Sequence, residues 1–256
     1  MIDLHCHMLP AIDDGAVDVQ MALEMARIAA ADGIHTLACT PHIYPGLYEN
    51  TAEGIRTAMV AFQSELDCRG VHLRLVEGAD VHLDVDLIGS IRDGRVPTLA
   101  GSRYLLLEPP HHVAPPRFAD SVFQMLVGGY VPVITHPERL SWIEGNYDVF
   151  KAIVKGGAWM QITSGSLTGR FGRRPRYWAE RMLDDGLVHI LATDAHHPKR
   201  RPPLLAEGRA AAAKRVGDQE ATHMVLTRPQ GILDNISPDA MPACFDAAPE
   251  PTRLTT

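Results

Sequence analysis

Histidine and carboxylate residues recur at the ends of short apolar segments along this 256-residue chain. His5 and His7 are separated by one residue, so in a strand both imidazoles lie on one face and can bind one ion. Such a pair is weak evidence by itself, because surface and core histidines are common. The pattern repeats, however, at Asp14, His42, Asp80, Glu108, His136, Asp194 and His196. Together these residues indicate a metal site with mixed nitrogen and oxygen ligands.

The elements that must position these residues alternate between β-rich runs and segments of helical period. This alternation predicts an α/β fold with βα units around a parallel sheet or barrel. Six of the seven expected strands have His, Asp or Glu at or just after their carboxyl ends. In barrel-like folds these ends meet at one edge, so we expect the six sets of side chains to converge there and not to be placed by chance. The expected strands are Ile2–His7, Thr36–Thr40, Leu73–Gly78, Tyr104–Glu108, Val131–His136, Trp159–Thr163 and Val188–Thr193.

Helices are expected between these strands. Ala22, Met25 and Ala29 recur at the spacing of one helix face, with Asp18 as the expected N-cap and Gly33 beyond the end. Further helices are expected over 51–66, 117–128, 146–155, 174–185 and 203–215.

The composition fits one domain, with 46% hydrophobic residues. We place this domain over 1–235 and expect 236–256, which is rich in proline, to be a flexible tail. The 24 Lys+Arg against 31 Asp+Glu give a net charge of −7, which argues against a nucleic-acid partner but is compatible with a local anion site.

The chain is expected to be cytoplasmic. It contains no apolar stretch of the ~20 residues that a membrane span requires, and it has no signal-peptide pattern, so no membrane insertion is expected. Its four cysteines have no Cys-x-x-Cys spacing, which fits a reducing compartment. The sequence is also compatible with oligomerisation.

The residue pattern as a whole resembles the polymerase and histidinol phosphatase (PHP) superfamily. Within it, the chain is most similar to the bacterial tyrosine phosphatases encoded with capsule and exopolysaccharide biosynthesis genes, from Met1 to about Asn235. The resemblance implies a distorted seven-stranded (β/α) TIM-like barrel. The motifs that carry it, besides the nine His, Asp and Glu residues, are Met1-Ile2-Asp3, Ile12-Asp13-Asp14-Gly15, His136-Pro137-Glu138-Arg139, Gly165-Ser166-Leu167 and Arg201-Pro202-Pro203.

The resemblance also implies three divalent metal ions. Manganese is expected, with iron or zinc as alternatives that the nitrogen and oxygen ligands also suit. At the bridging position the family usually has Glu, whereas this chain has the shorter Asp80, so the spacing of the bridged pair is in question. By this resemblance one ion is held by His5, His7 and Asp194, a second is shared through Asp80 and completed by Glu108 and His136, and a third is held by Asp14, His42 and His196.

Such a site would hydrolyse phosphoesters. Two ions about 3.5–4 Å apart can generate a hydroxide that attacks phosphorus in line with the ester bond. By resemblance, Arg139 and Arg201 bind the phosphate; the alternative is a solvated loop arginine, with Lys199 and Arg200 as rivals of Arg201. A tyrosine leaving group has a pKa near ~10 and needs little help from a general acid, so none is assigned.

The expected function is therefore that of a protein-tyrosine phosphatase, with a tyrosine autokinase of polysaccharide biosynthesis as the implied substrate. One alternative is a phosphatase for histidinol phosphate or another small molecule. Another is a non-catalytic metal-binding regulatory protein, for which Asp80 is the best argument. Cys68 and Arg74 have the spacing of cysteine-dependent tyrosine phosphatases, but they precede a strand instead of opening a helix, so this interpretation is rejected.

Overall fold

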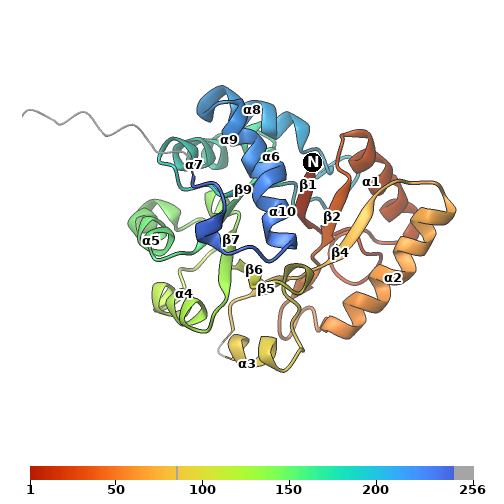
Figure 1. Ribbon diagram of the computed structural model, residues 1–256, viewed down its shortest axis with the longest axis horizontal. Coiled ribbons are helices and arrows are strands. Elements are labelled where there is room, and N and C mark those ends of the chain that lie inside the picture. Colours follow the sequence, from red (N-terminus) through yellow and green to blue (C-terminus); the bar gives the residue numbers. More distant parts are fainter. Residues whose placement is uncertain (85, 245–256) are drawn as a thin grey trace, which may run out of the picture.

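The computed structural model describes residues 1–84 and 86–244. Its strands pair in parallel and are surrounded by helices (Figure 1). One sheet has the order β1-β2-β4 and the other the order β3-β5-β6-β7-β8-β9. The strands are β1 (Ile2–Cys6), β2 (Thr36–Cys39), β3 (His42–Ile43), β4 (Arg74–Glu77), β5 (Asp80–His82), β6 (Tyr104–Glu108), β7 (Val131–Thr135), β8 (Trp159–Thr163) and β9 (Ile190–Ala192).

The expected closed barrel of seven strands is not confirmed, because the hydrogen-bond ladder of the described residues is interrupted. β2 ends before Pro41, which has no amide hydrogen to donate, and the chain then continues as β3 in the other sheet. β4 and β5 are separated by Gly78 and Ala79, and a Cβ at Gly78 would lie 2.9 Å from a methyl carbon of Leu99. An isolated bridge from Cys6 to Ala195 links β1 to the segment after β9.

All six expected helices are confirmed to within about three residues. Asp18 caps the first helix as predicted, accepting a hydrogen bond of 2.8 Å from the amide of Met21. Four short helices, α3, α6, α9 and α10, were not predicted, because four to six residues show too little periodicity. The helices are α1 (Val19–Ala31), α2 (Ala52–Cys68), α3 (Leu87–Arg92), α4 (Phe118–Val127), α5 (Ile143–Lys155), α6 (Ser164–Leu167), α7 (Arg173–Asp184), α8 (Ala206–Val216), α9 (Asp218–Thr222) and α10 (Arg228–Leu233), with single turns η1 (Leu99–Gly101), η2 (Pro137–Arg139), η3 (His223–Thr227) and η4 (Pro238–Ala240).

Two apolar clusters hold these layers together. The larger lies between strands and surrounding helices, and the smaller joins buried residues such as Ile2, Tyr104 and Trp159 of different strands. Ile232 of α10 belongs to the smaller cluster, and α10 crosses in front of the strands in Figure 1. One end of the strands is thus covered by α10, which leaves the other end for a site.

The segment after α10 remains attached to the domain as far as it is described. The fully buried Arg228 donates to the carbonyls of Pro242 (2.9 Å) and Ala243 and to Glu220 (3.0 Å). Residues 245–256, the rest of the expected tail, lie outside the described residues. Among the helices of the described chain, none is both long and apolar enough to cross a membrane.

Candidate metal centre

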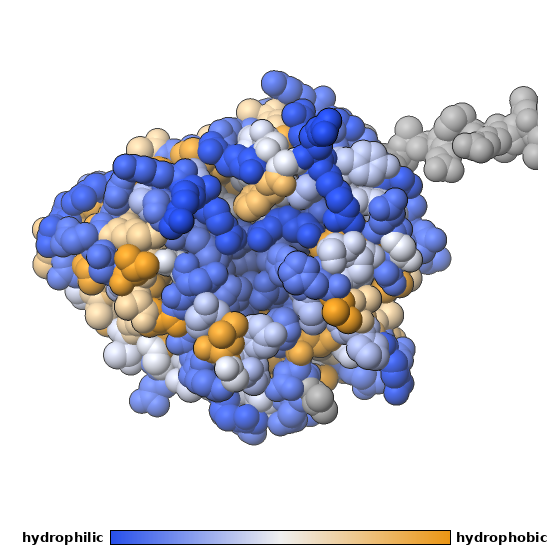
Figure 2. Space-filling model, turned by 180° about the vertical axis from the view of Figure 1, so that it is seen from behind, coloured by the Kyte–Doolittle hydropathy of each residue, from blue (hydrophilic) through white to orange (hydrophobic). Residues whose placement is uncertain are grey.

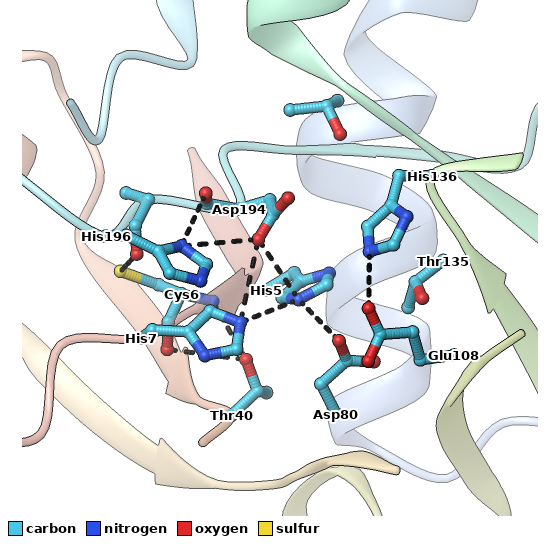
Figure 3. Close-up of polar contacts among 12 residues, drawn as sticks. His5, Cys6, His7, Thr40, Asp80, Glu108, Thr135, His136, Asp194 and His196 are labelled. Atoms are coloured by element: carbon cyan, nitrogen blue, oxygen red, sulfur yellow. Dashed lines mark hydrogen bonds and ion pairs between the residues drawn. The ribbon is translucent and has the colours of Figure 1, made fainter. Parts of the chain in front are cut away.

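A hydrophilic hollow opens on the face of the molecule opposite to α10 (Figure 2). The close-up in Figure 3 shows imidazoles and carboxylates from β1, β5, β6 and the turns after β7 and β9 pointing toward one another. The structure therefore brings together the side chains that were expected to converge. Among the described residues, four groups of His, Asp and Glu have ligand atoms close enough together to hold one ion. These groups are His7, Asp14, His42 and His196; His5, His7 and Asp80; Glu108, His111 and His136; and His42, Asp80 and Glu108.

The buried centre of the cluster is formed by His5, His7 and Asp80. The two Nε2 atoms of the histidines are 3.1 Å apart, and His5 Nε2 is 3.3 Å from Asp80 Oδ2. All three side chains are inaccessible to solvent. Within the described chain neither oxygen of Asp80 has a hydrogen-bond partner. A buried carboxylate without such partners is costly, and a cation would satisfy it, so these residues fit a metal ion.

Glu108 extends this cluster on one side. Its Oε2 lies 3.3 Å from Nδ1 of His42, and its Oε1 lies 3.5 Å from Nε2 of His136. The same His42 nitrogen is 3.6 Å from Asp80 Oδ2. Asp80 therefore lies between the His5 group and the Glu108 group, as a bridging ligand must, although its side chain is one methylene shorter than that of Glu.

Asp14 extends the cluster on the other side. Its Oδ1 is 3.5 Å from Nε2 of His42 and 3.4 Å from Nε2 of His196. The rings of His196 and His7 have centroids 3.9 Å apart. The Asp14 side chain is 48% exposed, whereas the other members are mostly buried. This third group is therefore the one that opens to solvent.

Asp194 connects the histidines with both predicted arginines. Its Oδ1 lies 3.5 Å from His5 Nε2, and its Oδ2 accepts hydrogen bonds from Arg201 (2.6 Å) and Arg139. Burial disfavours the charged form of Asp194, but Arg201 and Arg139 outweigh it and hold its pKa well below the usual range. The carboxylate is thus ionised, as a ligand to a cation must be.

The backbone is strained at two of these positions. His136 has φ 35° and ψ 49°, and Asp194 has φ 49°, both in the left-handed region that residues with a Cβ rarely adopt. His136 directly follows β7, and Asp194 is the second residue after the end of the short β9. Strain of this kind is concentrated at functional sites, where it turns a side chain toward the reacting groups.

The histidines differ in their electrostatic surroundings. Burial lowers the pKa of His5, but Asp80 and Asp194 outweigh it and raise the pKa to about 9. For His7, burial is reinforced by the neighbouring histidines, and its pKa falls well below the usual value. The pKa of Asp80 is raised by burial and by Glu108. The surroundings of His7 therefore favour the neutral imidazole, which is the form that binds a metal, and a bound cation would relieve the repulsion between Asp80 and Glu108.

Sequence reasoning missed several residues that hold the cluster in place. Asp13 was noted only as part of the Ile12-Asp13-Asp14-Gly15 motif, yet its Oδ2 is 2.7 Å from Nδ1 of His7. Gln161 Oε1 is 2.8 Å from Nδ1 of His5. The available signal was a glutamine in the middle of a predicted strand, between the apolar residues Met160 and Ile162. His111 was not among the predicted ligands, and its Nε2 lies 3.4 Å from Glu108 Oε1. Such partners fix ligand orientation.

The rejected interpretation of Cys68 and Arg74 gains no support from the structure. Cys68 is exposed at the end of α2, and Arg74 is exposed in β4, so they form no phosphate-binding loop that opens a helix. Cys6 is fully buried and contacts the carbonyl oxygen of Ala195 at 3.7 Å.

Comparisons with known proteins agree with this geometry. Residues 1–234 match the model of a family described as "Capsular polysaccharide synthesis, CpsB/CapC". The chain is 36% identical to the tyrosine-protein phosphatase YwqE of Bacillus subtilis over 237 residues, which cover 92% of each protein. The chain also matches a solved structure from a study of YwqE from Bacillus subtilis and CpsB from Streptococcus pneumoniae, which are described there as unique metal-dependent tyrosine phosphatases. The match has a TM-score of 0.88 and 33% identity, and it covers 93% of this chain and 96% of that one. A histidinol phosphate phosphatase from Lactococcus lactis shares the fold at a TM-score of 0.55 and 11% identity, covering 84% and 94%.

Proposed function

This chain belongs to the CpsB/CapC family of capsular polysaccharide synthesis, and from that premise we propose that it is a metal-dependent protein-tyrosine phosphatase. One observation carries the proposal. Asp80 is a fully buried carboxylate that has no hydrogen-bond partner among the described residues, and it is set between two histidine groups. An arginine pair lies on Asp194 beside it. Cation ligands next to guanidinium groups are what phosphoester hydrolysis requires.

We propose a three-ion centre, with manganese as the expected metal. Bound ions would activate water and neutralise phosphoryl oxygens. Asp80 reaches both neighbouring groups, which supports the bridging role and weakens the argument for a non-catalytic protein. The proposed ligands are His5, His7 and Asp194 for one ion, Asp80 as the bridge, Glu108 and His136 for the second, and Asp14, His42 and His196 for the third.

The chain's own residues would bind and orient the phosphoryl group. Arg139 and Arg201 are proposed to donate hydrogen bonds to its oxygens, because their side chains are only 15% and 27% exposed and their guanidinium groups contact Asp194 of the ligand cluster. The half-exposed Asp14 marks the side from which a bulky substrate would approach. A phenolate leaving group needs no assigned acid.

We propose a phosphotyrosine protein as the substrate and a tyrosine autokinase of polysaccharide biosynthesis as its source. Support comes from the relatives that are named tyrosine-protein phosphatases. We include a cytoplasmic location in the same proposal. We also infer that the two sheets together correspond to a distorted barrel, with the Cys6–Ala195 bridge joining β1 to the segment that follows β9, the last strand of the second sheet.

A phosphoester panel tests this function. The full chain would be loaded with Mn²⁺, Fe²⁺ or Zn²⁺, and initial rates measured on a phosphotyrosine peptide, the matched phosphoserine peptide and histidinol phosphate. We expect the highest kcat/KM on the phosphotyrosine peptide with Mn²⁺. A preference for histidinol phosphate would replace this function by a small-molecule phosphatase. Full metal occupancy without hydrolysis of any of the three substrates would favour the regulatory protein.

A further inference from the structure

The ring of Phe171 lies against both predicted phosphate-binding arginines. The Cζ atom of Arg139 is 4.6 Å from the ring centroid, and that of Arg201 is 5.7 Å from it. Phe171 belongs to the loop between α6 and α7, so three separate segments of the chain meet here. We propose that Phe171 is a positioning residue that holds the two guanidinium groups side by side for the phosphoryl group. This inference rests on the proposed function of the arginines.

An aromatic ring suits this task better than a second carboxylate. Two guanidinium groups at one carboxylate oxygen, Asp194 Oδ2, repel each other and need a further attractive partner. The face of an aromatic ring attracts a cation without accepting any of its N–H groups in a conventional hydrogen bond. The N–H groups of both arginines that do not bind Asp194 are therefore not taken up by the ring and can serve phosphoryl oxygens. In agreement with this, Nε of Arg201 is buried and has no hydrogen-bond partner among the described residues.

Gly165 provides the space for the ring. A Cβ at this buried position would lie 2.9 Å from Cε2 of Phe171 and 3.4 Å from Cδ of Arg170. Gly in a helix is otherwise unfavourable relative to Ala, so the missing side chain has a packing reason. Gly165 belongs to the Gly165-Ser166-Leu167 segment, whose part in the function had no explanation from the sequence.

The same short helix also fastens the turn that carries Arg139. Ser166 Oγ donates to Oε1 of Glu138 at 2.7 Å, and the amide of Thr163 donates to the same oxygen at 2.9 Å. Glu138 immediately precedes Arg139 in η2. α6 thus fixes the backbone of one arginine and makes room for the ring that supports both side chains.

The test compares Phe171→Leu with Phe171→Tyr in the full, manganese-loaded chain. The measurements are the inhibition constant of inorganic phosphate, KM and kcat on a phosphotyrosine peptide, and bound manganese. For Phe171→Leu we expect the inhibition constant and KM to rise about tenfold, the scale of a partly desolvated cation–π contact, at unchanged manganese content. Phe171→Tyr keeps a ring and should stay within about twofold of the wild type.

Gly165→Ala tests the same role in a second way, because the added methyl group would push the Phe171 ring away from the arginines. This variant should also raise the inhibition constant of phosphate. Phe123→Leu serves as the matched control, because Phe123 is exposed on α4 and should change nothing. Unchanged phosphate inhibition in a folded Phe171→Leu chain would overturn the role of Phe171 alone. A wild-type chain that neither binds phosphate nor cleaves phosphotyrosine would instead overturn the proposed function.

Discussion

The carboxylate of Asp13 lies 2.7 Å from Nδ1 of His7, on the side of the ring away from the other ligands. Because Nδ1 is engaged with Asp13, Nε2 is the nitrogen that faces the cluster, 3.1 Å from His5 Nε2. Asp13 also accepts hydrogen bonds from the amides of Gly15 (2.9 Å) and His42 (3.2 Å). It thereby ties two candidate ligands to the loop that carries Asp14.

Replacing Asp13 by Asn should weaken metal binding without unfolding the chain. Asn retains the shape but cannot accept with the strength of a carboxylate, so the orientation of His7 becomes looser. We expect metal affinity to fall about tenfold or more, the usual effect of losing such an outer partner. Titration of metal-free protein with Mn²⁺ measures this, with Asp120→Asn on the surface of α4 as the control. Equal affinities in the two variants would contradict the assignment.

Removal of the His136 imidazole should abolish turnover. His136 is buried, it faces Glu108 Oε1 at 3.5 Å, and its left-handed backbone aims it into the cluster. We expect His136→Ala to lose at least about a hundredfold in kcat, because two-ion chemistry depends on both ions being in place. Steady-state rates and metal content of the same sample report this. Wild-type turnover by a folded, metal-loaded variant would refute the site.

Asp80→Asn should separate stability from function. Burial and Glu108 raise the pKa of Asp80, so in the metal-free chain its ionisation opposes folding as pH rises through that raised pKa. Asn removes this effect, and the metal-free variant should unfold at a higher urea concentration than the wild type at pH 7. The same variant should bind less manganese and hydrolyse more slowly. A variant that is both less stable and fully active would show a structural role only.

The neighbouring residues His111 and His112 form a matched pair of test positions. His111 Nε2 lies 3.4 Å from Glu108 Oε1, and its ring centroid is 4.9 Å from that of His136, whereas His112 is exposed. We expect His111→Ala to lower the affinity for one manganese ion several-fold and His112→Ala to leave it unchanged. Competition with a chelator of known affinity distinguishes the two. Identical curves would exclude His111 from the metal centre.

His189 should make folding sensitive to acid at a place away from the ligands. Burial, reinforced by Arg228, lowers the pKa of His189 to about 3, and its Nδ1 accepts a hydrogen bond from the amide of Met160 at 3.1 Å. The unfolded chain binds this proton below a pKa of about 6.5, so stability is lost as pH falls from there toward 3. At pH 5 the loss is about 2 kcal/mol. His189→Asn should reduce the difference in unfolding free energy between pH 7 and pH 5; an unchanged difference would disprove this.

Sequence alone determined which residues end the strands. Strand side chains alternate, and the carboxyl ends of parallel strands share an edge, so His5, His7, Glu108 and His136 could be assigned to one site from local pattern and topology. The helices followed from apolar spacing, and α1 also from its cap. The resemblance in the motifs added Arg139 and Arg201, which the structure places together on Asp194.

Only the tertiary structure decided how that edge is arranged. The positions of segments far apart in sequence decide where the sheets break, at Pro41 and Gly78. They also decide the contact of Asp13 with His7 and that of Gln161 with His5. The same holds for the ring of Phe171 beneath two arginines. Periodicity reports which face of an element is buried. It carries no information about which atom of another element lies 3 Å away, because that distance is set by the packing of the whole domain.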